Sequence, residues 1–354
     1  MIADGAVVDG KYRIIRCLGG GAMGKVYQAE KVTTHERFAV KFIHDYLLSD
    51  DVYLARFERE VNALRGIRHP HVVDVYDWKL PGKGAGGHGY IVMEYLDGES
   101  FQQVLQRPAG VSLGEVARVM LQVIDGLTAV HGLGIVHRDL SPANIFLVGR
   151  DAAWRSVKIL DFGLAKGEAA ASAGDTDGGV TQNGAVLGRA AYAAPEMFLG
   201  VDLDERADVF ACGMIMYRAL ARRFPYRESK TDLIWVERYS ERYEEGRPYP
   251  SARTFNPSIP AAMDHIISKA IRKRPSERYQ KAVDMQADLV SAEAMLAKTP
   301  RVDSARPVEP EPPFDPAAGM TATRVDVPPP ADGSPTPGAA YGGAMQSVSN
   351  WLRG

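Results

Sequence analysis

The sequence predicts an α+β fold with two lobes: a small β-rich lobe near the N-terminus and a larger, mainly helical lobe after it. Short runs rich in β-branched and aromatic residues, separated by turn residues, fill 11–95, with one helical stretch at 52–65. The later segments with apolar residues at helical spacing are 112–131, 207–221, 260–272 and 280–296. This order, strands first and helices after, is typical of an α+β architecture.

Length and composition bound the class of protein. The 354 residues are enough for one domain of about 250 to 300 residues plus a tail. A net charge of -2 gives no sign of attraction to nucleic acid or membrane. The sequence has 2 cysteines, Cys17 and Cys212, too few for a disulfide framework or a thiolate metal cluster, which is typical of the cytoplasm. No signal peptide or membrane-spanning run is expected.

Composition also divides the chain into three parts. Residues 1–10 form a short N-terminal extension, 11–292 have the pattern of a globular domain, and 298–354 form a proline-rich tail. Ten of the 22 prolines lie in 301–340, and such sequence cannot bury enough apolar surface to form a core. We expect the tail to be disordered.

The first candidate site is a glycine-rich stretch, LGGGAMGKV, with the spacing G-x-G-x-x-G at Gly19, Gly21 and Gly24. Backbone without side chains lets amide N–H groups approach phosphate oxygens closely. Ordinary turns and dinucleotide-binding folds share this spacing. A dinucleotide site would open a helix, whereas KVYQAEKV continues here as a strand, so the pattern favours a hairpin that covers a nucleotide.

A lysine and a glutamate are both expected to face the core of the first lobe. Alternation in RFAVKFI puts Lys41 on an apolar face of its strand, and helical spacing puts Glu60 on the apolar stripe of 52–65. A lone lysine in such a position usually extends to the surface. A buried carboxylate, however, needs a cation, so we expect Lys41 and Glu60 to pair and to clamp phosphates.

Two acids and a carboxamide follow in the second lobe. Asp161 ends the apolar strand of SVKILDFGLA, and HRDLSPANIF supplies Asp139 and then Asn144. Carboxylate and amide oxygens are hard ligands suited to magnesium on ATP. Asp161 alone also fits an ordinary turn aspartate. The order of these features along the chain makes a nucleotide-phosphate site the stronger interpretation.

The joint motif set resembles that of the eukaryotic-type protein kinases, and among them the bacterial Hanks-type serine/threonine kinases. The resemblance covers 11–292 and implies the bilobal protein-kinase fold, with an antiparallel N-lobe at 11–96 that contains one key helix and a mainly helical C-lobe at 97–292. It implies an enzyme that transfers the γ-phosphate of ATP to protein hydroxyls, with Mg²⁺ as cofactor.

The resemblance also assigns roles at the matching positions. Asp139 would be the catalytic base, Asn144 and Asp161 would hold magnesium, and Lys41, oriented by Glu60, would hold the α- and β-phosphates. Met93 resembles the gatekeeper, and the backbone of Glu94 and Leu96 would read adenine. The positions implied to contact the nucleotide are Leu18, Gly19, Gly21, Gly24, Val26, Ala39, Lys41, Met93, Glu94, Leu96 and Phe146.

Further matches lie outside the nucleotide site. The resemblance pairs Glu196, in the motif Ala-Pro-Glu, with Arg278, and it gives Asp208 the task of holding the catalytic-loop backbone. A plain helix N-terminal charge is the alternative for Asp208. A hydrophobic stack between the lobes is also implied, formed by Leu64, Val75, His137 and Phe162.

Regulation is implied by the stretch GEAAASAGDTDGGVTQNGAVLG, which is long, acidic and rich in small residues. Arg138, in the HRD motif, marks in this family the kinases that are switched by phosphorylation of this stretch. The pattern VTQNGAVLG indicates Thr181 as the main autophosphorylation site, with Ser172 and Thr176 as secondary candidates.

Two positions depart from the family pattern. Ser141 stands where serine/threonine kinases carry a lysine that reaches the γ-phosphate, and Arg189 stands where they carry a threonine that bonds this lysine. Three interpretations stay open: drift in an active enzyme, compensation in which Arg189 supplies the missing cation as a catalytic residue, and decayed chemistry. Because Lys41, Asp139 and Asp161 are intact, an active kinase is favoured.

The alternative function is a nucleotide-binding pseudokinase scaffold whose tail recruits partners. Transfer to small molecules is disfavoured by the peptide-docking segment GRAAYAAPEM, and tyrosine specificity also fits the absent lysine. Expected partners are protein substrates, a second copy in a transient homodimer, and phosphothreonine-reading domains that would bind the tail at Thr323, three residues before Asp326. A solvated linker threonine is the plainer explanation of Thr323, because such triplets are common.

Overall fold

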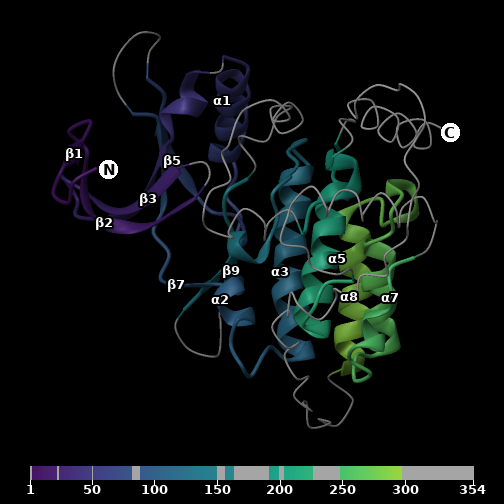
Figure 1. Cartoon of the computed structure of the whole chain (residues 1–354). Helices are drawn as coiled ribbons and strands as arrows, with labels where there is room; N and C mark the ends of the chain where they lie inside the picture. Colours follow the sequence, from purple (N-terminus) through teal and green to yellow (C-terminus); the bar gives the residue numbers. More distant parts are fainter. Residues whose placement is uncertain are drawn as a thin grey trace, which may run out of the picture. The chain divides into compact units, whose positions relative to one another are not determined.

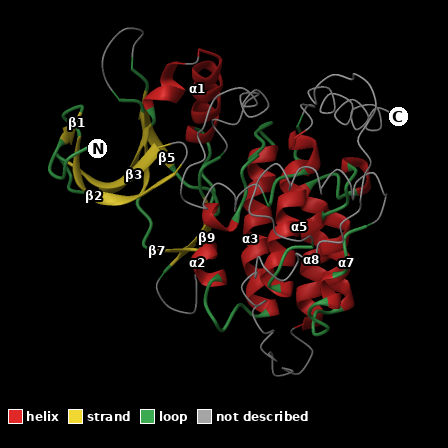
Figure 2. Cartoon of the chain, in the orientation of Figure 1, coloured by secondary structure: helices red, strands yellow, loops and turns green. Residues whose placement is uncertain are grey.

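A six-stranded antiparallel sheet forms the first lobe, in the strand order β1-β2-β3-β4-β6-β5 (Figures 1 and 2). Its strands are β1 (Val7–Val8), β2 (Tyr12–Gly21), β3 (Gly24–Lys31), β4 (Arg37–Ile43), β5 (Val75–Lys79) and β6 (Tyr90–Glu94). The strand pairs are antiparallel throughout this sheet. The antiparallel, β-rich first lobe expected from the sequence is therefore confirmed.

The computed structural model describes residues 2–21, 24–49, 51–81, 88–149, 156–162, 191–198, 203–225 and 248–296. These residues belong to one compact unit, Met1–Pro300, and a second unit comprises Arg301–Gly354. The proline-rich tail expected at 298–354 lies outside the described residues.

Part of the stretch expected to be an N-terminal extension, 1–10, pairs with this sheet. Strand β1 pairs with β2 through Val7 and Val8. The carboxylate of Asp9 then accepts a hydrogen bond from Lys79 Nζ at 2.6 Å and one from the Tyr90 hydroxyl at 2.8 Å. These bonds attach the N-terminal residues to β5 and β6.

The two faces of β4 contact different cores, as alternation predicts. Ala39 and Ile43 belong to the main hydrophobic core, whereas Val40 and Phe42 belong to a second cluster on the outer face of the sheet. Lys41 lies on the face that contacts the main core and is only 6% exposed. The alternative of a lysine extending to the surface is therefore wrong.

The helix α1 (Asp51–Arg65) packs its apolar stripe against the sheet. Phe57, Val61 and Leu64 are buried, and the ring of Phe57 contacts that of Trp78 on β5 with centroids 6.1 Å apart. This packing sets the rotation of α1 and so turns Glu60, on the adjoining face, toward the interior of the protein.

The two lobes are joined by a short backbone contact that also shortens β5. The segment before β5 pairs with the second lobe: Val73 N donates to Ile159 O at 3.0 Å, and Ile159 N donates to His71 O at 2.9 Å. The strand β5 therefore begins only at Val75, because the residues before it use their backbone hydrogen bonds in the other lobe.

The second lobe is mainly helical, as expected (Figure 2). Its helices are α2 (Phe101–Leu105), α3 (Leu113–His131), α5 (Arg206–Ala221), α7 (Ala261–Ala270) and α8 (Ala282–Leu296). Its strands form a small sheet of β7 (Gly98–Ser100), β8 (Ile145–Val148) and β9 (Ser156–Ile159). The short 3₁₀ turns of the second lobe are η2 (Pro142–Asn144), η4 (Pro195–Phe198), η5 (Ala252–Thr254) and η6 (Pro275–Glu277), and η1 (Asp45–Ser49) precedes α1 in the first lobe.

Helix α5 lies in the centre of this lobe and is buried on nearly every side. Its sequence accordingly lacks a polar face, as expected of a helix surrounded by others. Gly213 permits the end of α7 to approach α5 closely, because a Cβ atom at this position would lie 2.6 Å from Ile271 Cγ2 and 2.7 Å from Ala270 Cβ. The central position of α5 makes its first turn a fixed reference for the segments around it.

We predict that Gly126→Ala on α3 destabilises the protein by about 1–3 kcal/mol, the usual cost of overpacking. The added Cβ would lie 2.9 Å from both His71 O and Ile159 Cδ1, at the contact between the lobes. Gly114→Ala in the same helix is the control, because its Cβ meets nothing within 4 Å. Urea unfolding measures both variants, and equal stabilities for the two would contradict this packing.

Candidate active site

The catalytic-loop candidate 137–144 is held by its own hydrogen bonds. Asp139 N donates to His137 O at 2.8 Å, and Asn144 Nδ2 donates to Asp139 O at 2.8 Å. Arg138 has a φ of 61°, in the left-handed region that costs a non-glycine residue free energy. Asp139 is 7% exposed. The loop is therefore a compact, strained turn that orients one buried acid.

The side chain of Asp208, on α5, holds the backbone of this strained turn. Its carboxylate, 1% exposed, accepts hydrogen bonds from the backbone N–H groups of His137 at 2.8 Å and Arg138 at 3.0 Å. His131 Nε2 lies 2.7 Å from the same carboxylate. Burial opposes ionisation, yet the bonds from His131 and His137 hold the pKa of Asp208 below its usual range. The role expected of Asp208 is confirmed by these bonds.

Four charged side chains lie where the lobes meet. Lys41 Nζ on β4 lies 2.7 Å from Asp161 Oδ1, just after β9, and Glu60 Oε1 on α1 lies 3.9 Å from an Arg138 guanidinium nitrogen. Asp161 has a φ of 49°, a second strained residue in this region. The structure thus places Lys41 beside Asp161, a contact that the sequence did not predict, while the pairing of Lys41 with Glu60 stays a prediction.

One contact of the expected hydrophobic stack, between His137 and Phe162, is present in the structure. The rings of His137 and Phe162 have centroids 4.8 Å apart, and His137 Nε2 lies 2.9 Å from Leu160 O. Because His137 Nδ1 faces the Asp139 N–H, we assign the ring proton to Nε2. The four expected members, all buried, are Leu64, Val75, His137 and Phe162.

The glycine-rich stretch is the hairpin between β2 and β3. Gly24 needs to be glycine for packing, because a Cβ atom there would lie 1.8 Å from Phe42 O. Gly19 has no such requirement, since nothing lies within 4 Å of its Cβ position. Leu18 and Gly21, on the same hairpin, are exposed. Open backbone at Gly19 therefore fits an approaching phosphate, whereas Gly24 is explained by the strands alone.

Strand register brings the other expected nucleotide contacts together. Val26 is paired with Lys41, and Ala39 is paired with Met93. Phe146 lies on β8 in the second lobe, paired with Ser100 and Lys158. The apolar candidates thus come from both lobes.

The segment after β6 is fixed by the side chain of Glu94. Its Oε1 accepts a hydrogen bond from Asp74 N at 2.8 Å and lies 2.7 Å from Lys158 Nζ. Glu94 N in turn donates to Asp74 O at 3.0 Å. The Glu94 side chain is therefore engaged by the protein, so a role toward adenine would rest with the backbone of Glu94 and the half-buried Leu96.

Asn144 and Asp161 are suited to share a divalent cation. The nitrogen of the Asn144 amide faces Asp139 O, which leaves the amide oxygen as the ligand atom. Leu160 N donates to Asn144 O at 2.8 Å, so the backbone links the two candidate ligands. The described residues contain no group of three or more histidines, cysteines or acids that could hold a metal ion. Phosphate and water oxygens are the other ligands that Mg²⁺ commonly takes in proteins.

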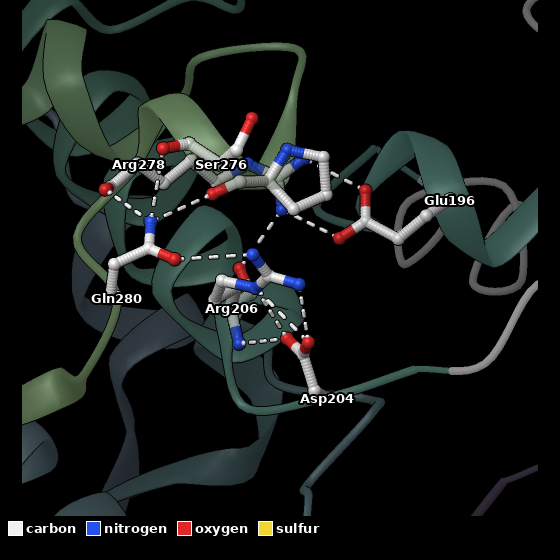
Figure 3. A network of polar contacts seen from close by, with 7 residues as sticks. Glu196, Asp204, Arg206, Ser276, Arg278 and Gln280 are labelled. Carbon is white, nitrogen blue, oxygen red and sulfur yellow. Dashed lines mark hydrogen bonds and ion pairs between the residues drawn. The ribbon is translucent and has the colours of Figure 1, made fainter. Parts of the chain in front are cut away.

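The Ala-Pro-Glu segment is attached to the lobe by a buried ion pair (Figure 3). Two nitrogens of Arg278 donate to the two carboxylate oxygens of Glu196 at 2.6 Å and 2.8 Å. The Arg278 side chain is 0% exposed, and such bidentate pairs fix both distance and orientation. The pairing expected of these residues is confirmed.

Several expected site residues lie outside the described residues. These are Ser172, Thr176, Thr181, Arg189 and Thr323. Ser141 is described and is 2% exposed, and its hydroxyl has no hydrogen-bond partner among the described residues. The question of compensation between Ser141 and Arg189 therefore stays a prediction.

Sequence reasoning missed three residues that the structure places near the site. His131 ends α3 and faces Asp208 and Glu205, with its Nδ1 3.3 Å from the Glu205 carboxylate. Arg206 and Gln280 extend the network around Arg278, as Figure 3 shows. Helical periodicity could have placed His131 on the inner face of α3, but nothing in the spacing identifies the partners of any of the three.

A glycine-rich hairpin, a buried lysine paired with an acid, and a strained acidic loop between two lobes together define a nucleotide-dependent phosphotransfer fold. The sequence model of the protein kinase domain matches residues 12–289, so the chain belongs to the protein kinase family. The family implies ATP and a divalent metal ion, generally Mg²⁺.

Bacterial serine/threonine kinases are among the chain's relatives. It is 37% identical to the serine/threonine-protein kinase Pkn1 of Myxococcus xanthus over 270 residues, which cover 76% of this chain and 36% of the relative. It is 34% identical to PknB of Mycobacterium tuberculosis over 280 residues, which cover 79% of this chain and 42% of the relative. The chain therefore spans well under half the length of both.

Solved structures agree on the fold. The kinase domain of Mycobacterium tuberculosis PknI superposes with a TM-score of 0.62 at 26% identity, covering 82% of this chain and 99% of that domain. Within the part of the chain that the structure describes, none of the helices has the length and apolarity that a bilayer crossing requires.

We predict that Asp208→Asn lowers the free energy of unfolding by about 3 kcal/mol or more at neutral pH, because it leaves buried donors poorly paired. The pKa of this acid is lowered in the folded protein, so its stabilisation is present above the unfolded value, about 3.9, and is lost as pH falls through the folded value. Urea unfolding at several pH values should show the gap to wild type narrowing below about pH 4. A gap independent of pH would contradict this account.

Proposed function

We propose that this chain is an ATP- and magnesium-dependent protein kinase that phosphorylates serine and threonine hydroxyls. The observation that carries the proposal is the meeting of Lys41 and Asp161 at 2.7 Å beside a strained loop that presents Asp139. The relatives' names support the serine/threonine assignment. A pseudokinase scaffold is less well supported, because the expected lysine, catalytic acid and metal ligands are all present.

Each residue has a role that its surroundings support. Asp139 would accept the proton of the substrate hydroxyl and orient the oxygen for in-line attack on the γ-phosphorus. Lys41, oriented by Glu60, would bind the α- and β-phosphates. Asn144 and Asp161 would hold the cation, which when bound neutralises phosphate charge. The chain thus supplies orientation and fixed charges to the transfer.

The nucleotide base would lie between the lobes. Val26 and Ala39 above and Phe146 below would enclose adenine, next to the gatekeeper Met93, and the backbone of Glu94 and Leu96 would supply its hydrogen bonds. The hairpin of Leu18, Gly19, Gly21 and Gly24 would cover the phosphates. The open Cβ position at Gly19 supports this arrangement.

Activation would follow phosphorylation of Thr181. Arg138, which lies near Glu60, would supply a guanidinium for the added phosphate. Autophosphorylation would take place in a transient homodimer. Protein substrates are the expected partners, phosphothreonine-reading domains would bind the tail at Thr323, and the cytoplasm is the expected location.

We predict that Lys41→Met abolishes phosphotransfer while the fold remains, because methionine fills a similar volume without the charge. Radiolabelled ATP with a generic basic protein measures transfer, and Asp139→Asn should likewise lose self-labelling. Lys11→Met is the matched control, since it removes an exposed lysine that lies 3.4 Å from Asp77. Transfer by Lys41→Met at the wild-type rate would refute the kinase assignment.

A second prediction concerns Ser141 and Arg189. If Arg189 supplies the cation that Ser141 lacks, Arg189→Thr should slow turnover by roughly 10² to 10³, the cost of one lost transition-state contact. Ser141→Lys alone should be neutral or harmful, and the double variant should recover much of the loss. The measurement is the steady-state rate of the wild type, the two single variants and the double variant. Independent, additive effects would contradict compensation and favour evolutionary drift at the two positions.

A further inference from the structure

The first turn of α5 contacts two separate parts of the site. Asp208 in this turn holds the catalytic-loop backbone, as described above. Two residues earlier, the backbone oxygen of Arg206 accepts a hydrogen bond from Arg278 at 3.0 Å. Because Arg278 also binds Glu196, one helical turn links the catalytic loop with the Ala-Pro-Glu segment.

Arg278 is fully engaged by surrounding acceptors. Besides Glu196 and Arg206 O, its guanidinium donates to Arg272 O at 2.7 Å and to Lys273 O at 2.9 Å. These carbonyls belong to the loop before η6, so the direction of the Arg278 fork depends on the positions of that loop and of the start of α5. A shift of either would move Glu196 with it.

The side chains of Arg206 and Gln280 join η6 to the start of α5 (Figure 3). Arg206 NH1 donates to Gln280 Oε1 at 3.1 Å. Gln280 Nε2 donates to the carbonyl oxygens of Pro275 at 3.1 Å, Ser276 at 3.2 Å and Arg278 at 2.9 Å. The opposite amide orientation would set oxygen against three carbonyls, so these contacts determine the orientation.

The other side of Arg206 is fixed by Asp204. Arg206 Nε and NH2 donate to its carboxylate at 2.9 Å and 2.6 Å. These hydrogen bonds hold the pKa of Asp204 below its usual range, against the opposing effect of partial burial. With Asp204 on one side and Gln280 on the other, the guanidinium of Arg206 has a defined direction despite its partial exposure.

The segment controlled by this network forms a wall beside the catalytic acid. A pocket next to Asp139 is lined by Arg138, Leu140, Tyr192, Met197 and Ala211 among others. Met197 directly follows Glu196 in η4. The position of Glu196 therefore sets where Tyr192 and Met197 lie beside Asp139, the residue expected to act on the hydroxyl of a protein substrate.

We propose that Arg206 and Gln280 are positioning residues for protein substrate: they fix Arg278, and through Glu196 they fix the 191–198 wall beside Asp139. This inference rests on the proposed kinase function. It predicts an effect on the protein substrate and little effect on ATP, because the nucleotide contacts lie on other elements.

The test compares Gln280→Met and Arg206→Met, made singly and together in the full chain. Gln280 is exposed, so methionine there can be accommodated without unfolding the protein. Arg13→Met is the matched control, because it removes a partly exposed ion pair, Arg13 to Glu30 at 2.8 Å, on the sheet of the first lobe. KM and kcat are measured for a generic basic protein and for ATP, together with thermal stability.

Each network variant should raise KM for the protein substrate about tenfold, as expected for the loss of a hydrogen bond with a charged group, while KM for ATP changes less than about twofold. The double variant should be no worse than either single one, because both belong to one chain of contacts. Arg13→Met should leave both KM values unchanged. A parallel rise in both KM values, a fall in stability alone, or no change would overturn the proposal.

Hydrogen exchange in 191–198 separates this inference from the proposed function. If the wild-type protein transfers no phosphate, the proposed function fails, and exchange decides the positioning role. Faster exchange of this segment in both network variants than in wild type and Arg13→Met supports the role. Equal exchange in all of the proteins overturns it.

Discussion

The buried carboxylate of Asp208 is the interaction on which the site depends. It accepts the backbone N–H groups of His137 and Arg138 from within the lobe. Arg138 holds a left-handed conformation that costs free energy, and such a residue persists only where its surroundings determine it. The placement of Asp139 and Asn144 follows from this turn. The buried carboxylate of Asp208 can fix this turn because hydrogen-bond donors surround it, whereas an unpaired buried charge would destabilise the fold.

The location of Asp208 on α5 explains why the site is rigid on this side. The helix is surrounded by the lobe, and Gly213 lets α7 approach it closely. The first turn of α5 therefore has little conformational freedom. It positions the catalytic loop through Asp208, and it positions Glu196 through Arg278. Asp139 and the 191–198 segment are thereby both positioned by the first turn of α5, which suits the proposed phosphotransfer, a reaction that depends mainly on positioning.

The nucleotide side of the site has a different construction. Lys41 comes from the first lobe and Asp161 from the second, and their ion pair spans the junction at 2.7 Å. The lobes are also joined through Ile159, whose backbone bonds His71 and Val73 just before Asp161. Phe162 then packs on His137. One short segment thus carries a lobe contact, a candidate metal ligand and a member of the hydrophobic stack.

The sequence alone determined the lobe order and the principal strands and helices, and it suggested the residues of the proposed phosphate site, because alternation, helical spacing and glycine placement are local properties of the chain. Tertiary structure alone decided which partners those residues have. Lys41 lies 2.7 Å from Asp161, a contact between the lobes that the sequence did not predict. The inclusion of Val7 and Val8 in the sheet, the start of β5 at Val75 and the network of Arg206 with Gln280 were not predicted from the sequence either. Each depends on which backbone donors and acceptors meet after packing, and no local pattern records that.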